Sequence, residues 1–130
     1  MQKSRYSFVL DLQSTESQIC LIAAEGDTNR ELAISFSDGG VPFNLAGNET
    51  VVIFIEGPKG THKAACTVEN GGAYYKFDKY TCPIEGLHKC QLFIFEGKVD
   101  ENYELFVEGD ELWSPQFGLF VGPKKKRTMT

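Results

Sequence analysis

The chain has 130 residues, of which 42% are hydrophobic and 12% aromatic, and this excludes both an intrinsically disordered chain and two full-size domains. Its formal net charge is −5, but four cations cluster at 124–127, which leaves 9 cations against 18 anions and a charge of −9 for the rest. Such an acidic body repels phosphate backbones, and no apolar run reaches the ~20 residues of a membrane span. We expect one domain over 1–123 and a basic, disordered tail over 124–130, made in the cytoplasm, with neither nucleic acid nor membrane as a partner.

The first half of the chain alternates apolar and polar residues with the period of two that predicts β-strands. The run 19–24 is apolar at every position, which predicts a central strand covered on both faces. A turn follows, and residues 31–36 are expected to form a strand with one buried face. Pro42 lacks the N–H that a central strand needs, so the segment 41–45 is expected to cross between sheets.

The middle of the chain predicts three further strands. Residues 50–56 and 62–69 flank a Gly-Pro-Lys-Gly turn and predict a β-hairpin, and the alternation over 73–78 predicts a strand with one buried face. No segment carries a convincing apolar stripe at helical spacing. Any helix is therefore expected to be short and to lie at 78–83.

The last third of the chain begins with a run over 88–96 that has large or apolar residues on both of its sides. One side carries Cys90, Leu92 and Ile94, and the other carries Gln91, Phe93 and Phe95. This pattern predicts a strand with both faces occupied, followed by strands over 103–108 and 112–121. About eight antiparallel strands result, which predicts an all-β fold, either a β-sandwich or a small barrel.

No group of residues has the spacing of a known active site or metal site. His62 and His88 lie in different strand regions, where we expect exposed strand ends. The acids near the C-terminus lack the regular spacing of a calcium loop and are expected to mark a solvated strand face. They are Asp100, Glu101, Glu104, Glu108, Asp110 and Glu111. The sequence therefore predicts a protein that is not an enzyme, with no catalytic residue, no cofactor and no metal.

The four cysteines form no Cys-x-x-Cys pair and have no clustered histidines beside them, so the spacing of a zinc site is absent. We expect the cysteines to be small buried side chains in the reduced state. A disulfide would require an oxidising compartment. Cys82 and Cys90, which flank a Pro-containing turn region, are the pair for which a disulfide stays open.

Aromatic residues offer an alternative function. Rings exposed on a β-sandwich can stack on sugar rings, although core packing explains most of these side chains equally well. The candidates for stacking on a glycan are Tyr74, Tyr75 and Trp113. The alternative prediction is a carbohydrate-binding β-sandwich that attaches a phage or an enzyme to bacterial cell-wall glycan.

The order of strands and turns resembles one family, the N-terminal domain of phage baseplate upper proteins. The similarity runs from about residue 9 to residue 121 and rests on a series of short landmarks. These are the strand 19–24 with Gly-Asp-Thr at 26–28, the strand 32–34 with Asp-Gly at 38–39, the connection Val-Pro-Phe-Asn-Leu-Ala-Gly at 41–47, the strand 51–55 with Pro-Lys-Gly at 58–60, Gly86 before 90–95, and Ser-Pro-Gln-Phe at 114–117. Asn44 and Ala46 depart from the acid and the threonine that are usual in that connection.

The resemblance implies an immunoglobulin-like β-sandwich with a structural role in a phage or prophage tail baseplate. It implies docking on neighbouring virion proteins, assembly into a homo-oligomer and a location in the virion tail, and it carries over no catalytic residue. In that family the domain leads into a longer chain, whereas this sequence ends at Thr130. Two interpretations are left open: a stand-alone relative of the family, or a shortened chain.

Overall fold

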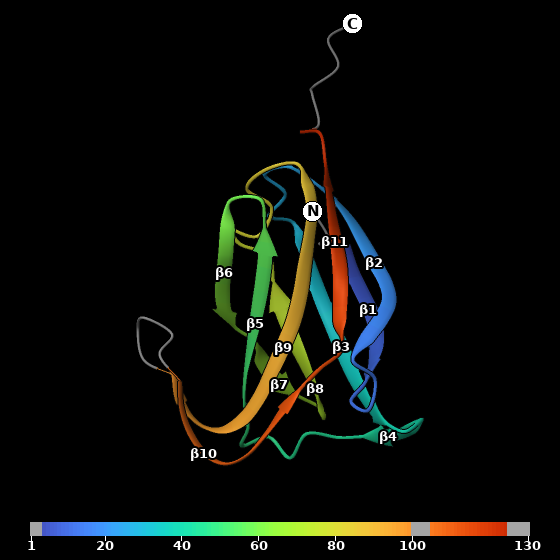
Figure 1. Ribbon diagram of the computed structural model, residues 1–130, viewed down its shortest axis with the longest axis vertical. Helices are drawn as coiled ribbons and strands as arrows, with labels where there is room; N and C mark the ends of the chain where they lie inside the picture. The colour runs from blue at the N-terminus through green and yellow to red at the C-terminus, as the bar shows by residue number, and fades with distance from the viewer. Residues whose placement is uncertain (1–3, 100–104, 125–130) are drawn as a thin grey trace, which may run out of the picture.

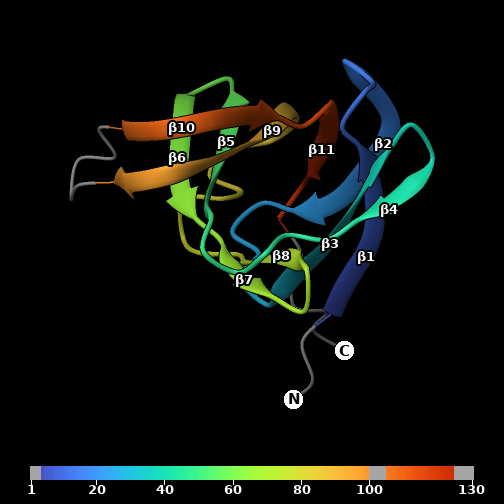
Figure 2. The same ribbon diagram turned by 90° about the horizontal axis from the view of Figure 1, so that it is seen from below.

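Two β-sheets packed face to face make up the computed structural model, which describes residues 4–99 and 105–124 (Figures 1 and 2). Those residues form eleven strands and no helix, so they also contain no helix long and apolar enough to cross a membrane. The predicted all-β sandwich is therefore confirmed.

The first sheet has the strand order β1-β3-β8-β7, and β4 pairs with β3 beside this path. Its strands are β1 (Ser4–Asp11), β3 (Arg30–Asp38), β4 (Val41–Phe43), β7 (Thr67–Glu69) and β8 (Gly72–Lys76). The side chain of Asp11 joins two turns of this sheet, because its carboxylate accepts the N–H groups of Gln13, Gly39 and Gly40. These backbone hydrogen bonds, that of Gln13 foremost, lower the pKa of Asp11.

The second sheet has the order β2-β11-β9-β5-β6, and β10 pairs with β9 beside this path. Its strands are β2 (Glu16–Ala24), β5 (Thr50–Gly57), β6 (Gly60–Ala65), β9 (Gly86–Val99), β10 (Leu105–Trp113) and β11 (Gln116–Gly122). The long strand β9 pairs with β11 near its start and with β10 further on. The paired part of β9 and β10 extends sideways from the body, as Figure 2 shows.

The structure differs from the sequence-based expectation in strand number and direction. About eight antiparallel strands were expected, whereas two of the strand pairs, β1 with β3 and β2 with β11, are parallel. The N-terminal strand β1 was not predicted. The expected strand over 62–69 is divided at Cys66, where the chain passes from β6 in the second sheet to β7 in the first, and the expected strand over 112–121 is interrupted at Ser114 and Pro115.

Two local predictions were wrong. The run 19–24 is not central, because β2 ends the order of the second sheet and its burial alternates along the strand. Residues 78–83 form turns and not a helix: Asp78 accepts the N–H of Tyr80 at 2.7 Å, and its own N–H donates to the hydroxyl of Thr81 at 2.9 Å. Such side-chain bonds to nearby backbone compete with helix formation.

The main core fills the space between the sheets. Alternate residues of β3, β5, β9 and β11 point into it, among them Ile34, Ile53, Leu92 and Leu119, each no more than 2% exposed. The rings of Phe8 and Phe117 meet edge to face across the two sheets, with their centroids 5.2 Å apart. Aromatic contact of this kind adds to the burial of apolar area that holds the layers together.

A second, smaller cluster lies on the outer face of the second sheet. Val52, Phe93 and Phe95 are buried there, and Phe54 packs against them. The prediction that β9 has both faces covered is confirmed, because Leu92 and Ile94 face the main core while Phe93 and Phe95 belong to this outer cluster. Apolar residues on both sides of one strand thus indicate that its two faces pack against two different clusters, here the main core and the outer cluster.

Candidate functional site

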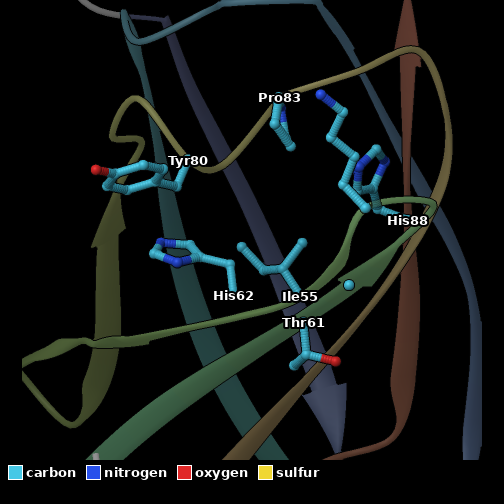
Figure 3. A pocket seen from close by; sticks show the side chains of 8 residues that line it. Ile55, Thr61, His62, Tyr80, Pro83 and His88 are labelled. Atoms are coloured by element: carbon cyan, nitrogen blue, oxygen red, sulfur yellow. The ribbon is translucent and has the colours of Figure 1, made fainter. Parts of the chain in front are cut away.

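A cavity of about 270 Å³ opens beside the β5–β6 turn and brings the two histidines together (Figure 3). His62 from β6 and Tyr80 from the segment before β9 line one side, and His88 from the start of β9 lines the other. Strand pairing explains the meeting, because β5 pairs with both β6 and β9. This meeting could not be predicted from the sequence, which does not show which strands are neighbours.

His62 is held by a carboxylate. Its Nε2 lies 3.0 Å from Oδ2 of Asp78, and its ring packs 5.6 Å from the ring of Tyr80. Burial raises the pKa of Asp78, but the hydrogen bond with His62 and the N–H of Tyr80 outweigh this, so the pKa lies below its ordinary value. The pair therefore fixes the segment between β8 and β9 against the β5–β6 hairpin.

Acid is expected to weaken the fold through Asp78. A carboxyl whose pKa is lower in the folded than in the unfolded state stabilises the fold above the unfolded value of about 3.9, and this contribution is lost as the pH falls through the folded pKa. The thermal midpoint of Asp78→Asn should therefore fall less between about pH 5 and pH 3 than that of the parent. Melting curves across this range test it, with exposed Glu85→Gln as the control; equal pH dependence of Asp78→Asn and the parent would contradict it.

His88 fills space and does not present a reactive nitrogen. Its side chain is 2% exposed, its Nδ1 lies 3.1 Å from the carbonyl oxygen of Gly86, and its buried Nε2 has no hydrogen-bond partner among the described residues. The ring lies against Gly57, where a Cβ would come within 2.5 Å of Nε2. The expectation that both histidines are exposed strand ends is therefore wrong, because packing on a glycine encloses the ring of His88 and His62 is half-buried on β6.

Three of the four cysteines are poorly suited to act as nucleophiles. All four are free, and Cys82 and Cys90 are buried without a disulfide between them. Burial raises the pKa of Cys66, Cys82 and Cys90 to about 12, so these thiols stay protonated near neutral pH. Cys20 is exposed, on the outer face of β2.

The part of the chain that the structure describes holds no group of three or more His, Cys, Asp and Glu side chains that could bind a metal ion. Asp100, Glu101 and Glu104 of the predicted acidic strand face lie outside the described residues, as do the side chains of Glu108 and Asp110. Glu111 is exposed on β10.

The three predicted glycan-stacking residues are not brought together. Tyr75 is 2% exposed in the main core, and its hydroxyl lies 2.6 Å from Oγ1 of Thr81. Tyr74, its neighbour on β8, points to the other face of the first sheet, where the guanidinium of Arg5 lies 5.7 Å from its ring centroid. Trp113 lies on the second sheet and is 46% exposed. Of these three residues, only Trp113 presents a ring on the outer face of the second sheet.

The same outer face carries an exposed apolar row that the sequence analysis missed. Ile22 of β2, Phe120 of β11 and Leu87 of β9 lie side by side in register across three strands. Their exposed fractions are 65%, 46% and 54%. We call these three residues the outer row. The run 19–24 could have indicated this surface, but both of its faces were predicted to be covered by other parts of the protein.

A shallow groove of about 380 Å³ adjoins the outer row, between β2, β11 and the start of β9. Gly118 forms its floor, since a Cβ there would lie 3.1 Å from Sγ of Cys20 and 3.5 Å from a methyl carbon of Leu87. Polar side chains border it, including Gln18, Lys89 and Gln116. An apolar centre with a polar rim is the usual composition of a protein interface.

Comparison with known proteins finds similarity of structure but not of sequence. No family model and no curated protein matches the sequence. Among solved structures, the N-terminal domain of ORF48 from phage TP901-1 superposes with a TM-score of 0.66 over 94% of this chain and 99% of that one, at 12% sequence identity. This chain therefore shares the fold of a domain from a phage protein.

Proposed function

We propose that this protein is a non-enzymatic assembly module of a phage or prophage tail baseplate, located in the virion tail and docking on neighbouring virion proteins through the outer face of its second sheet. The observation that carries the proposal is the outer row, Ile22, Phe120 and Leu87, exposed side by side on three paired strands. Contiguous exposed apolar groups on a soluble domain mark interaction sites, whereas scattered ones do not.

The geometry of the face supports docking. Its apolar residues lie on hydrogen-bonded strands and not on loops, so little conformational entropy is lost when a partner covers them. Specific interfaces bury about 800 Å² on each partner, more than three side chains supply. The groove floored by Gly118 extends the apolar centre, and Lys89 and Gln116 provide a polar rim. The body's charge of −9 favours partners with a neutral or basic surface.

Two further observations support a place in a phage particle. The landmarks in the sequence resemble phage baseplate upper proteins, and the fold is that of a domain from a phage TP901-1 protein. A role without catalysis fits the enclosed ring of His88 and the protonated buried cysteines. Self-association into a homo-oligomer belongs to the same proposal, with the outer row as the shared surface.

Replacing Ile22 with aspartate is expected to weaken partner binding by about 30-fold or more, the effect of losing an interface hot spot of ~2 kcal/mol. The measurement is isothermal titration of the purified protein with recombinant tail proteins encoded beside its gene, preceded by light scattering of the protein alone. Val41→Asp is the matched control, since Val41 is also 65% exposed but lies on β4 of the first sheet.

These two variants and Phe120→Asp together separate docking from general effects of a new charge. Loss of binding in Ile22→Asp and Phe120→Asp, with binding kept in Val41→Asp, supports the proposal. Unchanged binding in both outer-row variants would contradict it. So would a parent protein that stays monomeric in the presence of every tail protein tested.

A further inference from the structure

The outer face of the second sheet also holds a rigid aromatic platform. The ring of Trp113 stacks on that of Phe93 with centroids 4.3 Å apart and an interplanar angle of 30°, and it lies 5.6 Å from the ring of Phe54. Phe93 is itself buried and stacked on Phe95. One face of the indole is thus covered, while the residue as a whole remains 46% exposed. The exposed area therefore includes the opposite face of a ring that cannot move freely.

A groove of about 300 Å³ lies beside this ring, large enough for a small ligand. Its polar lining includes Glu56 of β5, Lys89 and Gln91 of β9, and Gln116 of β11, together with Thr61 of β6. The amide nitrogen of Gln91 donates to the carbonyl oxygen of Ser114 at 2.8 Å, which fixes that side chain and leaves its oxygen as an acceptor. Hydrogen-bonding groups therefore surround the one exposed indole face.

We propose that this groove binds a neutral saccharide, with a pyranose ring stacked on Trp113 and its hydroxyls bonded to Gln91, Gln116 and Glu56. The aromatic centre of this site differs from that of the assembly proposal, because Trp113 is not part of the outer row, whereas Lys89 and Gln116 border both grooves. A pyranose offers an apolar face of C–H groups and a rim of hydroxyls that both donate and accept hydrogen bonds. This matches one aromatic face ringed by amides and a carboxylate.

Charge and hydrogen bonding favour a neutral sugar over other ligands. Glu56 and Lys89 are cross-strand partners on β5 and β9, so the groove has no net charge from this pair with which to select an ion. Proline-rich peptides also dock on exposed aromatic residues, but they offer chiefly carbonyl acceptors. The carboxylate of Glu56 and the side-chain oxygen of Gln91 are acceptors, to which sugar hydroxyls can donate.

Trp113 is the single tryptophan of the chain, so its fluorescence reports directly on the groove. The intact protein is titrated with chitotriose, maltotriose and cellotriose, and separately with a decaproline peptide. A saturable blue shift of the emission with at least one trisaccharide is expected, because a stacked sugar removes water from the indole. Decaproline should produce no saturable shift.

Calorimetry of variants locates the binding. Trp113→Ala is expected to abolish sugar binding, and Gln116→Ala to weaken it by about 3-fold to 10-fold, the effect of one neutral hydrogen bond. Trp113→Phe keeps the packing on Phe93 and should bind weakly, which guards against a folding defect in the alanine variant. Tyr80→Ala, which removes an aromatic ring 56% exposed in the histidine cavity, should bind as the parent does.

Several results would overturn this site. They are the absence of a saturable shift with all three trisaccharides, a shift with decaproline alone, or sugar binding that survives Trp113→Ala. Ile22→Asp distinguishes the two proposals, since it should lose protein partners while it retains the sugar-induced shift. Loss of sugar binding in Ile22→Asp would contradict the separation of the sites.

Discussion

Replacing Phe117 with alanine is expected to lower the free energy of unfolding by about 3–5 kcal/mol, the usual cost of deleting a buried aromatic ring. Phe117 is 2% exposed and packs edge to face on Phe8 of the opposite sheet. The substitution removes a contact between the two layers and leaves a cavity in the main core. Because domains of this size are stable by only about 5–15 kcal/mol, the variant is expected to be partly unfolded at moderate urea concentration. Urea titration followed by circular dichroism measures the loss.

Phe120→Ala is the matched control, since it deletes the same ring from the same strand on the opposite face. Phe120 is 46% exposed, so its removal should change the free energy of unfolding by no more than about 0.5 kcal/mol. Equal losses in the two variants would mean that the inward and outward assignments of β11 are wrong.

Replacing Gly57 with alanine is expected to cost about 1–3 kcal/mol, the range found when a well-packed site is overfilled. The cost is steric, because the new Cβ would come within 2.5 Å of Nε2 of His88 and still closer to Cδ2. The imidazole is 2% exposed and its Nδ1 lies 3.1 Å from the carbonyl oxygen of Gly86, so moving away from a Cβ at position 57 would disturb that contact. Chemical denaturation of Gly57→Ala against the parent gives the difference. Gly122→Ala is the control, with its nearest non-neighbouring atom at an ordinary 3.8 Å.

A double-mutant cycle tests the cause. In a His88→Ala background the alanine at position 57 has space, so the penalty of Gly57→Ala should largely disappear and the coupling energy should fall within about 0.5–3 kcal/mol. An undiminished penalty in that background would show that glycine is required at position 57 for a reason unrelated to His88.

The fold class could be predicted because alternation along single strands is a local property. The opposite faces of β9 were assigned correctly from Leu92 and Ile94 against Phe93 and Phe95. Strand neighbours could not be predicted, because β1 lies beside β3 and β2 beside β11 through pairing between distant segments. An apolar run such as 19–24 shows which residues are apolar, but not whether anything covers them.

The same limit applies to the candidate sites. Tyr75 and Trp113 looked equivalent in sequence, yet Tyr75 points into the main core and Trp113 lies on an outer face. Phe93, which stacks on Trp113, and Gln116, which lines the same groove, come from two other strands. His88 is a comparable case, since its burial depends on Gly57 across the β5–β9 pair. The sequence shows which residues could take part in binding or catalysis, but the neighbours of each residue are determined by how the strands pair in the folded sheets.

The parallel pairing of β2 with β11 determines when the second sheet can form during synthesis of the chain. Glu16 lies opposite Gln116, so the second sheet is complete only after almost the whole described chain has left the ribosome. Closing so long a loop is slow compared with forming the local β5–β6 hairpin. Before β11 has been synthesised, β2 has no strand to pair with. Its apolar side chains are then exposed to chaperones and to other nascent chains.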